Sequence, residues 1–172
     1  SAGGVAVAGW IENYEASRDF LVAKYSGEGE LLWAHDTGLV TDAGDAAVAV
    51  ACDVSGNTYA TGFCVTESTG RDYLTVKYGP SGVIDWATRY DGPASGDDDP
   101  SGLTVMPDGS VVVTGTSDGG VTGLDLATVC YSPHGNMRWV SRLAGSSGSA
   151  SDQAAGIRSC PDGPVVVPGM AF

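Results

Sequence analysis

Short segments in which apolar and polar residues alternate recur along the whole chain. In the segment DYLTVKY at 72–78, successive side chains fall on opposite faces, which is the period of a half-buried β-strand. A turn signal follows, because Pro80 pre-sets φ and Gly82 tolerates a positive φ. The segment IDW at 84–86 then resumes the alternation. The stretch Asp72–Trp86 therefore predicts a β-hairpin.

The hairpin pattern occurs three times, at a constant spacing of 53 residues. The copies are DFLVAKYSGEGELLW at 19–33, DYLTVKYGPSGVIDW at 72–86 and DLATVCYSPHGNMRW at 125–139. Four positions are identical in every copy: Asp19, Asp72 and Asp125; Tyr25, Tyr78 and Tyr131; Gly29, Gly82 and Gly135; and Trp33, Trp86 and Trp139. A fixed period of about 50 residues indicates a repeat architecture.

Two further strands complete each unit. Apolar segments that contain a glycine lie at 4–10, 58–63, 111–116 and 165–170, and other apolar segments lie at 46–52, 102–106 and 155–160. Tight-turn signals at 55–56, 108–109 and 162–163 join these segments in pairs. A glycine inside a strand usually marks a bulge or a close backbone approach. The chain shows no convincing helical periodicity, so every unit is expected to consist of strands.

Four antiparallel strands in each unit describe the blade of a β-propeller. We therefore expect an all-β fold, a β-propeller segment of about three four-stranded antiparallel blades of 53 residues plus an extra strand pair. Residues 1–172 would form a single repeat domain, a partial propeller with units at about 1–45, 46–98, 99–151 and 152–172. Propellers close with about 4–8 blades, so the partners expected first are other blades of a longer chain or other copies of the chain itself.

Four motifs carry a resemblance to a known family. DYLTVKY at 72–78, GDDD at 96–99, SGN at 55–57 and YATG at 59–62 resemble the SBBP-type β-propeller repeats of bacterial and archaeal secreted proteins. The third unit departs from the pattern, with Cys130 where Lys24 and Lys77 stand. The resemblance implies a propeller scaffold that is secreted or lies at the cell surface. The Gly-x-x-x-Trp turns also resemble quinoprotein propeller repeats, which would imply a quinone-dependent dehydrogenase.

Charge narrows the classes of partner. The chain has 21 acidic and 8 basic residues and a formal charge of −13. Such a surface repels nucleic acid and anionic membranes, and it suits a secreted or salt-exposed protein. No apolar run approaches the roughly 18 residues of a membrane span, so no membrane insertion is expected. The sequence starts without Met and shows no signal peptide, so we expect a processed or excised piece, or a chain whose start is unresolved.

The repeated tryptophans and aspartates have structural interpretations. Trp33, Trp86 and Trp139 are expected to be largely buried at equivalent sites, whereas Trp10 lies outside the series and should be more exposed than they are. Asp19, Asp72 and Asp125 begin equivalent strands. We expect each to accept backbone N–H bonds from the preceding loop, in preference to a ring of metal ligands.

The acidic run Asp97, Asp98 and Asp99 is the candidate metal site. Carboxylate oxygens suit Ca²⁺, but the run lacks EF-hand spacing, and three adjacent carboxylates cannot all face one ion. Asp45, Asp98 and Asp152 occupy matching positions once one inserted residue is allowed. The favoured interpretation is a repeated loop anchor with no metal and no other cofactor, and Ca²⁺ at Asp97–Asp99 is the alternative.

The four cysteines, Cys52, Cys64, Cys130 and Cys160, show no CxxC spacing, so a zinc site is not expected. The predicted register places Cys52 opposite about Tyr59, away from Cys64. Small buried thiols are the favoured interpretation, and a Cys130–Cys160 bridge is the alternative.

No catalytic residues are expected. The two histidines, His35 and His134, lack a triad pattern nearby, and the chain contains no P-loop, GxGxxG or HExxH motif. The favoured function is a non-catalytic extracellular or cell-surface scaffold for display, or for binding a protein or glycan. One alternative is a self-assembling module whose open blades pair between chains into a ring or filament. The other is part of the quinone-dependent dehydrogenase.

Overall fold

The computed structural model describes residues 4–12, 17–37, 44–144, 152–160 and 165–170. These residues form β-strands, connecting loops and one 3₁₀ turn, η1 (Gly120–Thr122), and every paired strand is antiparallel. The strands are β1 (Val5–Glu12), β2 (Arg18–Tyr25), β3 (Leu31–Thr37), β4 (Ala46–Cys52), β5 (Thr58–Thr66), β6 (Gly70–Tyr78), β7 (Ile84–Tyr90), β8 (Asp98–Val105), β9 (Val111–Asp118), β10 (Leu124–Tyr131), β11 (Met137–Leu143), β12 (Gln153–Ala154), β13 (Arg158–Ser159), β14 (Val165–Val166) and β15 (Gly169–Met170). The described helical structure includes nothing long and apolar enough to cross a membrane.

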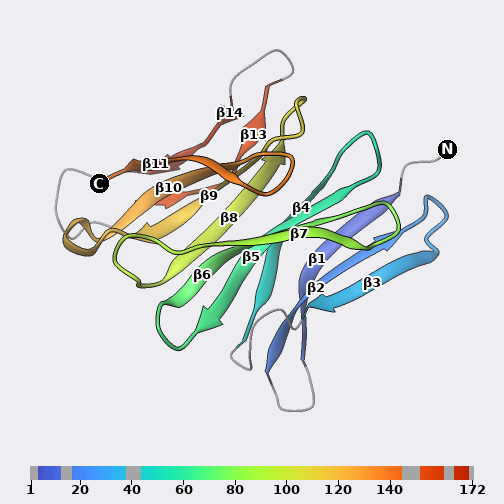
Figure 1. Ribbon diagram of the computed structural model, residues 1–172, viewed down its shortest axis with the longest axis horizontal. Coiled ribbons are helices and arrows are strands. Elements are labelled where there is room, and N and C mark those ends of the chain that lie inside the picture. Colours follow the sequence, from blue (N-terminus) through green and yellow to red (C-terminus); the bar gives the residue numbers. More distant parts are fainter. Residues whose placement is uncertain (1–3, 13–16, 38–43, 145–151, 161–164, 171–172) are drawn as a thin grey trace.

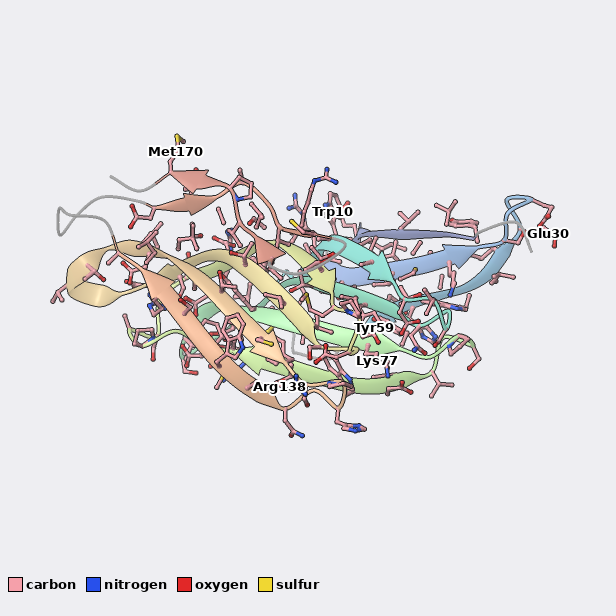
Figure 2. All side chains as sticks on the ribbon, turned by 90° about the horizontal axis from the view of Figure 1, so that it is seen from above. Trp10, Glu30, Tyr59, Lys77, Arg138 and Met170 are labelled. Atoms are coloured by element: carbon pink, nitrogen blue, oxygen red, sulfur yellow. The ribbon has the colours of Figure 1, made fainter. Side chains whose placement is uncertain are left out.

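Three sheets follow one another along the chain (Figure 1). The first sheet has the order β1-β2-β3, the second β4-β5-β6-β7, and the third β8-β9-β10-β11. β4 contacts both β1 and β8, so neighbouring sheets meet near their first strands. Figure 2 places Glu30 at the tip of the first sheet and Met170 at the opposite end of the molecule. The expected all-β antiparallel fold is confirmed, and within the described residues the sheets do not close into a ring.

The repeated hairpins form as the alternation predicts. The turns that join β2 to β3, β6 to β7 and β10 to β11 are called edge turns. They are Ser26–Gly29, Gly79–Gly82 and Ser132–Gly135. In every edge turn the final glycine donates its N–H to the first residue's carbonyl and has a φ between 81° and 88°. In all three sheets the pairing between the two strands of the hairpin shifts register by one residue just before the recurring tyrosine, Tyr25, Tyr78 or Tyr131. The turn glycine is required at these positions because other residues rarely adopt this φ.

Glycines inside the second strand of the unit accept a close backbone neighbour. A Cβ on Gly62 would lie 1.9 Å from the carbonyl oxygen of Ala46, and a Cβ on Gly115 would lie 2.2 Å from that of Asp99. β4 and β8 bulge beside these glycines. The expected close approach is therefore confirmed. At Gly9 a Cβ would meet nothing within 4 Å among the described residues, because the first sheet lacks the neighbouring strand.

The fourth unit is broken into four short strands where two longer ones are predicted. β12 pairs with β15, and β13 pairs with β14. Pro168 has no N–H to donate and separates β14 from β15, while Gly156 has a φ of 148° and separates β12 from β13. The turn predicted at 162–163 lies outside the described residues.

Two apolar cores fill the spaces between successive sheets. Between the first and second sheets lie Phe20, Val22, Trp33, Ala47, Ala60, Cys64, Leu74, Val76 and Tyr78. Between the second and third sheets lie Tyr59, Tyr73, Tyr90, Leu103, Val111, Val113, Ala127, Val129 and Tyr131. Because each core takes residues from both of its sheets, the sheets stabilise one another face to face.

Candidate functional site

A tryptophan of the first sheet lies against the edge turn of the second. Trp33 Nε1 donates a hydrogen bond of 3.2 Å to the carbonyl oxygen of Pro80. Its indole covers Gly82 so closely that a Cβ there would lie 2.8 Å from the ring. The same ring stacks on Tyr78, with centroids 5.4 Å apart. The Trp33 contact therefore requires glycine at position 82, because any side chain there would collide with the indole.

The second sheet repeats this contact on the third. Trp86 Nε1 donates a hydrogen bond of 2.9 Å to the carbonyl oxygen of Pro133. A Cβ on Gly135 would lie 2.8 Å from the indole of Trp86. The ring centroids of Trp86 and Tyr131 are 6.3 Å apart. A tryptophan that covers the next sheet's edge turn is therefore the repeating element of both junctions, and is called here the tryptophan contact.

The expectation that all three tryptophans are buried is wrong for the last one. Trp33 is 9% exposed and Trp86 is half-buried, but Trp139 is 47% exposed. The reason is that burial of each tryptophan depends on the edge turn of the following unit. The described part of the fourth unit supplies only β12–β15, without such a turn. Trp10 is 47% exposed, which is more than Trp33 and Trp86, as expected, but equal to Trp139.

The edge turn of the first sheet is not covered by a tryptophan of the described residues. Gly29 has the same left-handed φ as Gly82, but a Cβ there would meet nothing within 4 Å among the described residues. Tyr25 is half-buried, whereas Tyr78 and Tyr131 are buried. The described molecule therefore has an uncovered edge turn at one end and an uncovered tryptophan at the other.

Buried aspartates recur where the second, third and fourth units begin. Asp45 Oδ1 accepts the N–H of Val65 at 2.9 Å, and Asp98 Oδ1 accepts that of Asp118 at 3.0 Å. The backbone N–H of Asp152 donates 2.8 Å to the carbonyl of Leu124. Burial raises the pKa of both Asp45 and Asp98, because desolvation disfavours the charged form. The expected loop anchor is confirmed for Asp98, because its carboxylate also accepts the N–H of Gly92 in the preceding loop. The Asp45 carboxylate instead accepts from a residue of β5, and Asp152 is buried at the matching position.

The expected partners of Asp72 and Asp125 are wrong. Asp72 Oδ2 accepts from the Thr69 hydroxyl at 2.7 Å and pairs with Arg89 at 3.1 Å, instead of accepting loop N–H groups. Asp125 Oδ2 likewise accepts from Thr122 at 3.1 Å and pairs with Arg142 at 2.9 Å. Asp19 is half-buried, and its coulombic interaction with Asp45 raises the pKa of Asp45. A threonine hydroxyl and a last-strand arginine take the place of the backbone donors because both reach the carboxylate from the same sheet.

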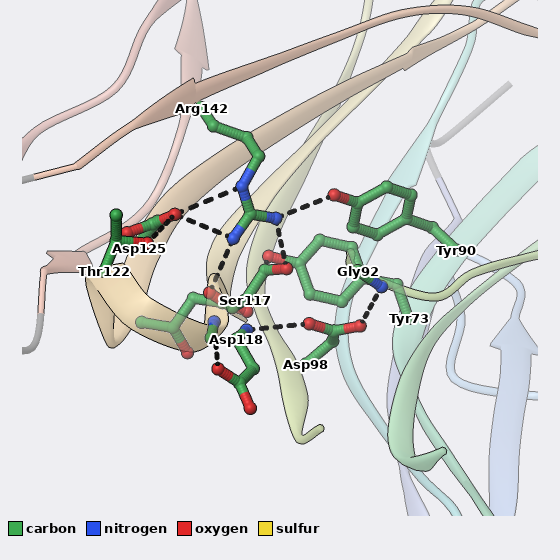
Figure 3. Close-up of polar contacts among 11 residues, drawn as sticks. Tyr73, Tyr90, Gly92, Asp98, Ser117, Asp118, Thr122, Asp125 and Arg142 are labelled. Atoms are coloured by element: carbon green, nitrogen blue, oxygen red, sulfur yellow. Dashed lines mark hydrogen bonds and ion pairs between the residues drawn. The ribbon is translucent and has the colours of Figure 1, made fainter. Parts of the chain in front are cut away.

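Arg142 extends this network across the junction between the second and third sheets (Figure 3). Its guanidinium donates 3.0 Å to the Tyr90 hydroxyl and 2.6 Å to Ser117 Oγ. The Tyr73 hydroxyl also crosses this junction, donating 3.0 Å to the carbonyl of Thr116. Burial opposes the charged form of Arg142, but hydrogen bonds to Asp125 and Tyr90 raise its pKa overall. Arg142 therefore remains a fixed cation that links the two sheets.

Sequence reasoning missed the arginines. Arg89 and Arg142 are 53 residues apart, as are Thr69 and Thr122, so the repeat contained the signal. The first unit has Asp36 at the corresponding position, so the arginine is not identical in all three units and does not stand out as a repeated residue.

The structure does not bring the acidic run together. Asp97 Oδ1 accepts the backbone N–H of Arg71 at 3.0 Å, and Asp99 pairs with the Arg71 guanidinium at 3.1 Å on the surface. Asp98 points inward instead, because neighbouring residues on β8 face opposite sides. This arrangement does not favour a shared Ca²⁺ site at Asp97–Asp99, and that alternative stays a prediction. Asp98 lies instead beside Asp72 and Asp91.

The cysteines divide into two pairs. Cys64 and Cys130 are buried, and burial raises the pKa of the Cys64 thiol to about 12. Cys52 and Cys160 are exposed, so the expectation of four buried thiols is wrong for these two, which lie at the end of β4 and directly after β13. All four thiols are free, so the alternative Cys130–Cys160 bridge is not formed. Cys52 pairs with Thr58, which confirms that it does not face Cys64.

The exposed cysteines share a surface groove of about 580 Å³. Its walls are the turns that join the first two strands of the second and third sheets, together with the end of β13. The lining includes Cys52, Val54, Met106, Asp108 and Cys160. A concave surface with apolar walls and a few polar groups is the usual form of a ligand site.

Comparison with known proteins gives information on the fold alone. Neither a protein-family model nor a curated protein matches the sequence. A crystal structure of a protein of unknown function from Bacteroides caccae is similar, with a TM-score of 0.60 and 13% sequence identity. The match covers 98% of this chain and 51% of that one, so the chain spans about half the length of this neighbour.

Proposed function

We propose that the sheets are successive blades of a β-propeller of the SBBP type, and that the chain is part of a non-catalytic extracellular or cell-surface scaffold. The observation that carries this proposal is the tryptophan contact, which repeats between the first and second sheets and between the second and third. A contact that recurs at successive junctions is what repeated packing of blade on blade in a propeller would produce.

A scaffold agrees with the use of the recurring polar residues. Asp72, Asp125 and Arg142 are engaged in contacts within and between sheets, which hold the surface loops in place. The groove beside Val54 and Met106 is then the favoured place for a protein or glycan ligand. The charge of −13 favours a partner that is neutral or basic, and acidity together with the sequence resemblance supports a secreted or surface location.

The test places a charge in the groove and another outside it. Val54 is fully exposed in the groove, and Val121 is comparably exposed on η1, away from the groove. On an array of neutral glycans, we expect Val54→Asp to reduce binding at least tenfold and Val121→Asp to leave it unchanged. Reduction of a dye acceptor by protein supplied with a quinone cofactor would contradict the scaffold and favour the dehydrogenase.

Self-assembly is a second candidate, because the two ends of the described molecule are complementary. Trp139 is an uncovered tryptophan, and the edge turn that ends at Gly29 is uncovered. In one copy Trp139 would cover the Gly29 turn of the next copy. Head-to-tail contacts of this kind form rings or filaments. Since β14–β15 and β1 hold equivalent places in the repeat, one of them has to move aside in such a contact.

Light scattering at increasing protein concentration tests this second candidate. We expect association that Trp139→Ala weakens and Trp10→Ala does not, because the two side chains are equally exposed but only Trp139 belongs to the repeated contact. A monomer at every concentration, or equal effects of the two substitutions, would exclude assembly through this contact.

A further inference from the structure

Three carboxylates converge at the junction between the second and third sheets. Asp72 lies on β6, Asp91 follows β7, and Asp98 begins β8. One carboxylate oxygen from each lies within 4.8 Å of one from each of the others. Asp72 and Asp98 are fully buried, and Asp91 is half-buried. The cluster therefore gathers three acids in a place that excludes most water.

Two oxygens of this cluster lack a partner. Asp72 Oδ2 is engaged by Thr69 and Arg89, which leaves Oδ1 as the oxygen that Asp72 can offer to the cluster. Among the described residues, Asp72 Oδ1 and Asp91 Oδ1 are both buried without any hydrogen-bond partner. Buried acceptors without a donor are rare in folded proteins, and a bound ion is one of the few explanations for them.

The spacing suits a calcium ion. Ca²⁺ takes oxygen ligands at about 2.3–2.6 Å, so two oxygens on opposite sides of the ion stand up to about 5 Å apart. All three carboxylate oxygens of the cluster fall within that span. Asp98 is also held in place, because its carboxylate accepts the N–H groups of Gly92 and Asp118. One arginine, Arg89, faces the three acids through Asp72 Oδ2, so the cluster retains negative charge.

Two of the three acids recur in the other units, and Asp91 does not. The pair Asp72 and Asp98 has counterparts in Asp19 with Asp45 and in Asp125 with Asp152, so a pair of acids belongs to every junction. The position of Asp91 is occupied by Gly38 in the first unit and by Ala144 in the third. Asp91 is thus dispensable for the fold of a unit, and it supplies a third ligand at the central junction alone.

We propose that Asp72, Asp91 and Asp98 bind one divalent cation, with Ca²⁺ as the favoured ion, between the second and third sheets. The cation links β6 and the segment after β7 to the start of β8. Binding stabilises the folded chain and leaves the other junctions unchanged.

The experiment measures Ca²⁺ binding to metal-stripped protein by calorimetry and by thermal unfolding, with NaCl matched for ionic strength. We expect one site per chain and a rise in Tm of about 5–10 °C at a hundredfold excess over Kd. Asp91→Asn should abolish the rise. Asp99→Asn, an exposed acid of the same segment that lies outside the cluster, should preserve it.

Two results would overturn the proposal. One is a wild-type Tm that does not respond to millimolar Ca²⁺ beyond the NaCl control. The other is an equal response in the wild type and in Asp91→Asn. Asp91 is half-buried and has no counterpart in the other units, so its substitution should leave the unfolding of metal-free protein almost unchanged, and a folded variant remains available for comparison.

Discussion

At the scale of single residues, one backbone position decides whether a tryptophan can pack. Gly135 and Gly29 share a left-handed φ, but an indole covers Gly135 and nothing within the described residues covers Gly29. Alanine at either position costs about 1–2 kcal/mol through backbone strain. At Gly135 it also pushes the Trp86 ring away, and overpacking of this kind costs a further 1–3 kcal/mol or so.

We therefore expect Gly135→Ala to destabilise the chain more than Gly29→Ala, and denaturant unfolding measures the difference directly. Equal losses for the two substitutions would show that the tryptophan contact contributes nothing beyond the strain of the turn.

Asp45 makes stability depend on pH. Burial raises its pKa in the folded state, so the native chain holds this proton more tightly than the unfolded chain does. The stabilisation from Asp45 is therefore present below the unfolded pKa of about 4, and it is lost as pH rises through the folded pKa. In EDTA, we expect Asp45→Asn to lose less stability than the wild type between pH 4 and pH 7.

Asp36→Asn is the matched control for this measurement, because it removes the same charge from an exposed side chain. Thermal unfolding at a series of pH values reports both slopes. If the two variants have the same slope, the pH dependence comes from the overall negative charge and not from Asp45.

At the scale of elements, equivalent tryptophans have unequal roles. Trp33 fills a core between two sheets, so Trp33→Ala should cost about 3–5 kcal/mol. Trp139 on β11 is exposed, and Trp139→Ala should change the stability of the isolated chain by less than about 0.5 kcal/mol. Chemical denaturation of both variants checks this, and a large loss for Trp139→Ala would mean that residues outside the described ranges cover it.

The strands could be predicted from sequence because their signals are local. Alternation and turn glycines placed the hairpins correctly, and the bulges beside Gly62 and Gly115 followed from the glycines themselves. The environment of Trp139 could not be predicted from its own unit, because it depends on the next edge turn. Asp91 also escaped prediction, since it recurs in no other unit and meets Asp72 and Asp98 only after the sheets pack.

At the scale of the whole molecule, the interior sheets should be the most stable part. β5, β6, β9 and β10 pair with strands on both sides and belong to sheets that have a neighbour on each face, whereas β1 has one paired edge and β12–β15 form only short pairs. Hydrogen exchange should therefore be slowest in these four strands and fastest in β1 and β12–β15. Uniform protection across the chain would instead indicate a single cooperative unit that includes both ends.

The tryptophan contact has a consequence for how such a chain can be inherited. Each full unit carries both halves of the contact within one period, an edge turn that receives an indole and a tryptophan that covers the next turn. An in-frame duplication of one unit therefore produces two junctions that fit at once, without any compensating mutation. Duplication or loss of a whole unit therefore preserves the contact at every junction that remains. The number of units can then change without a change in the contact, whereas the constant spacing of 53 residues between Trp33, Trp86 and Trp139 keeps each indole in register with the next edge turn.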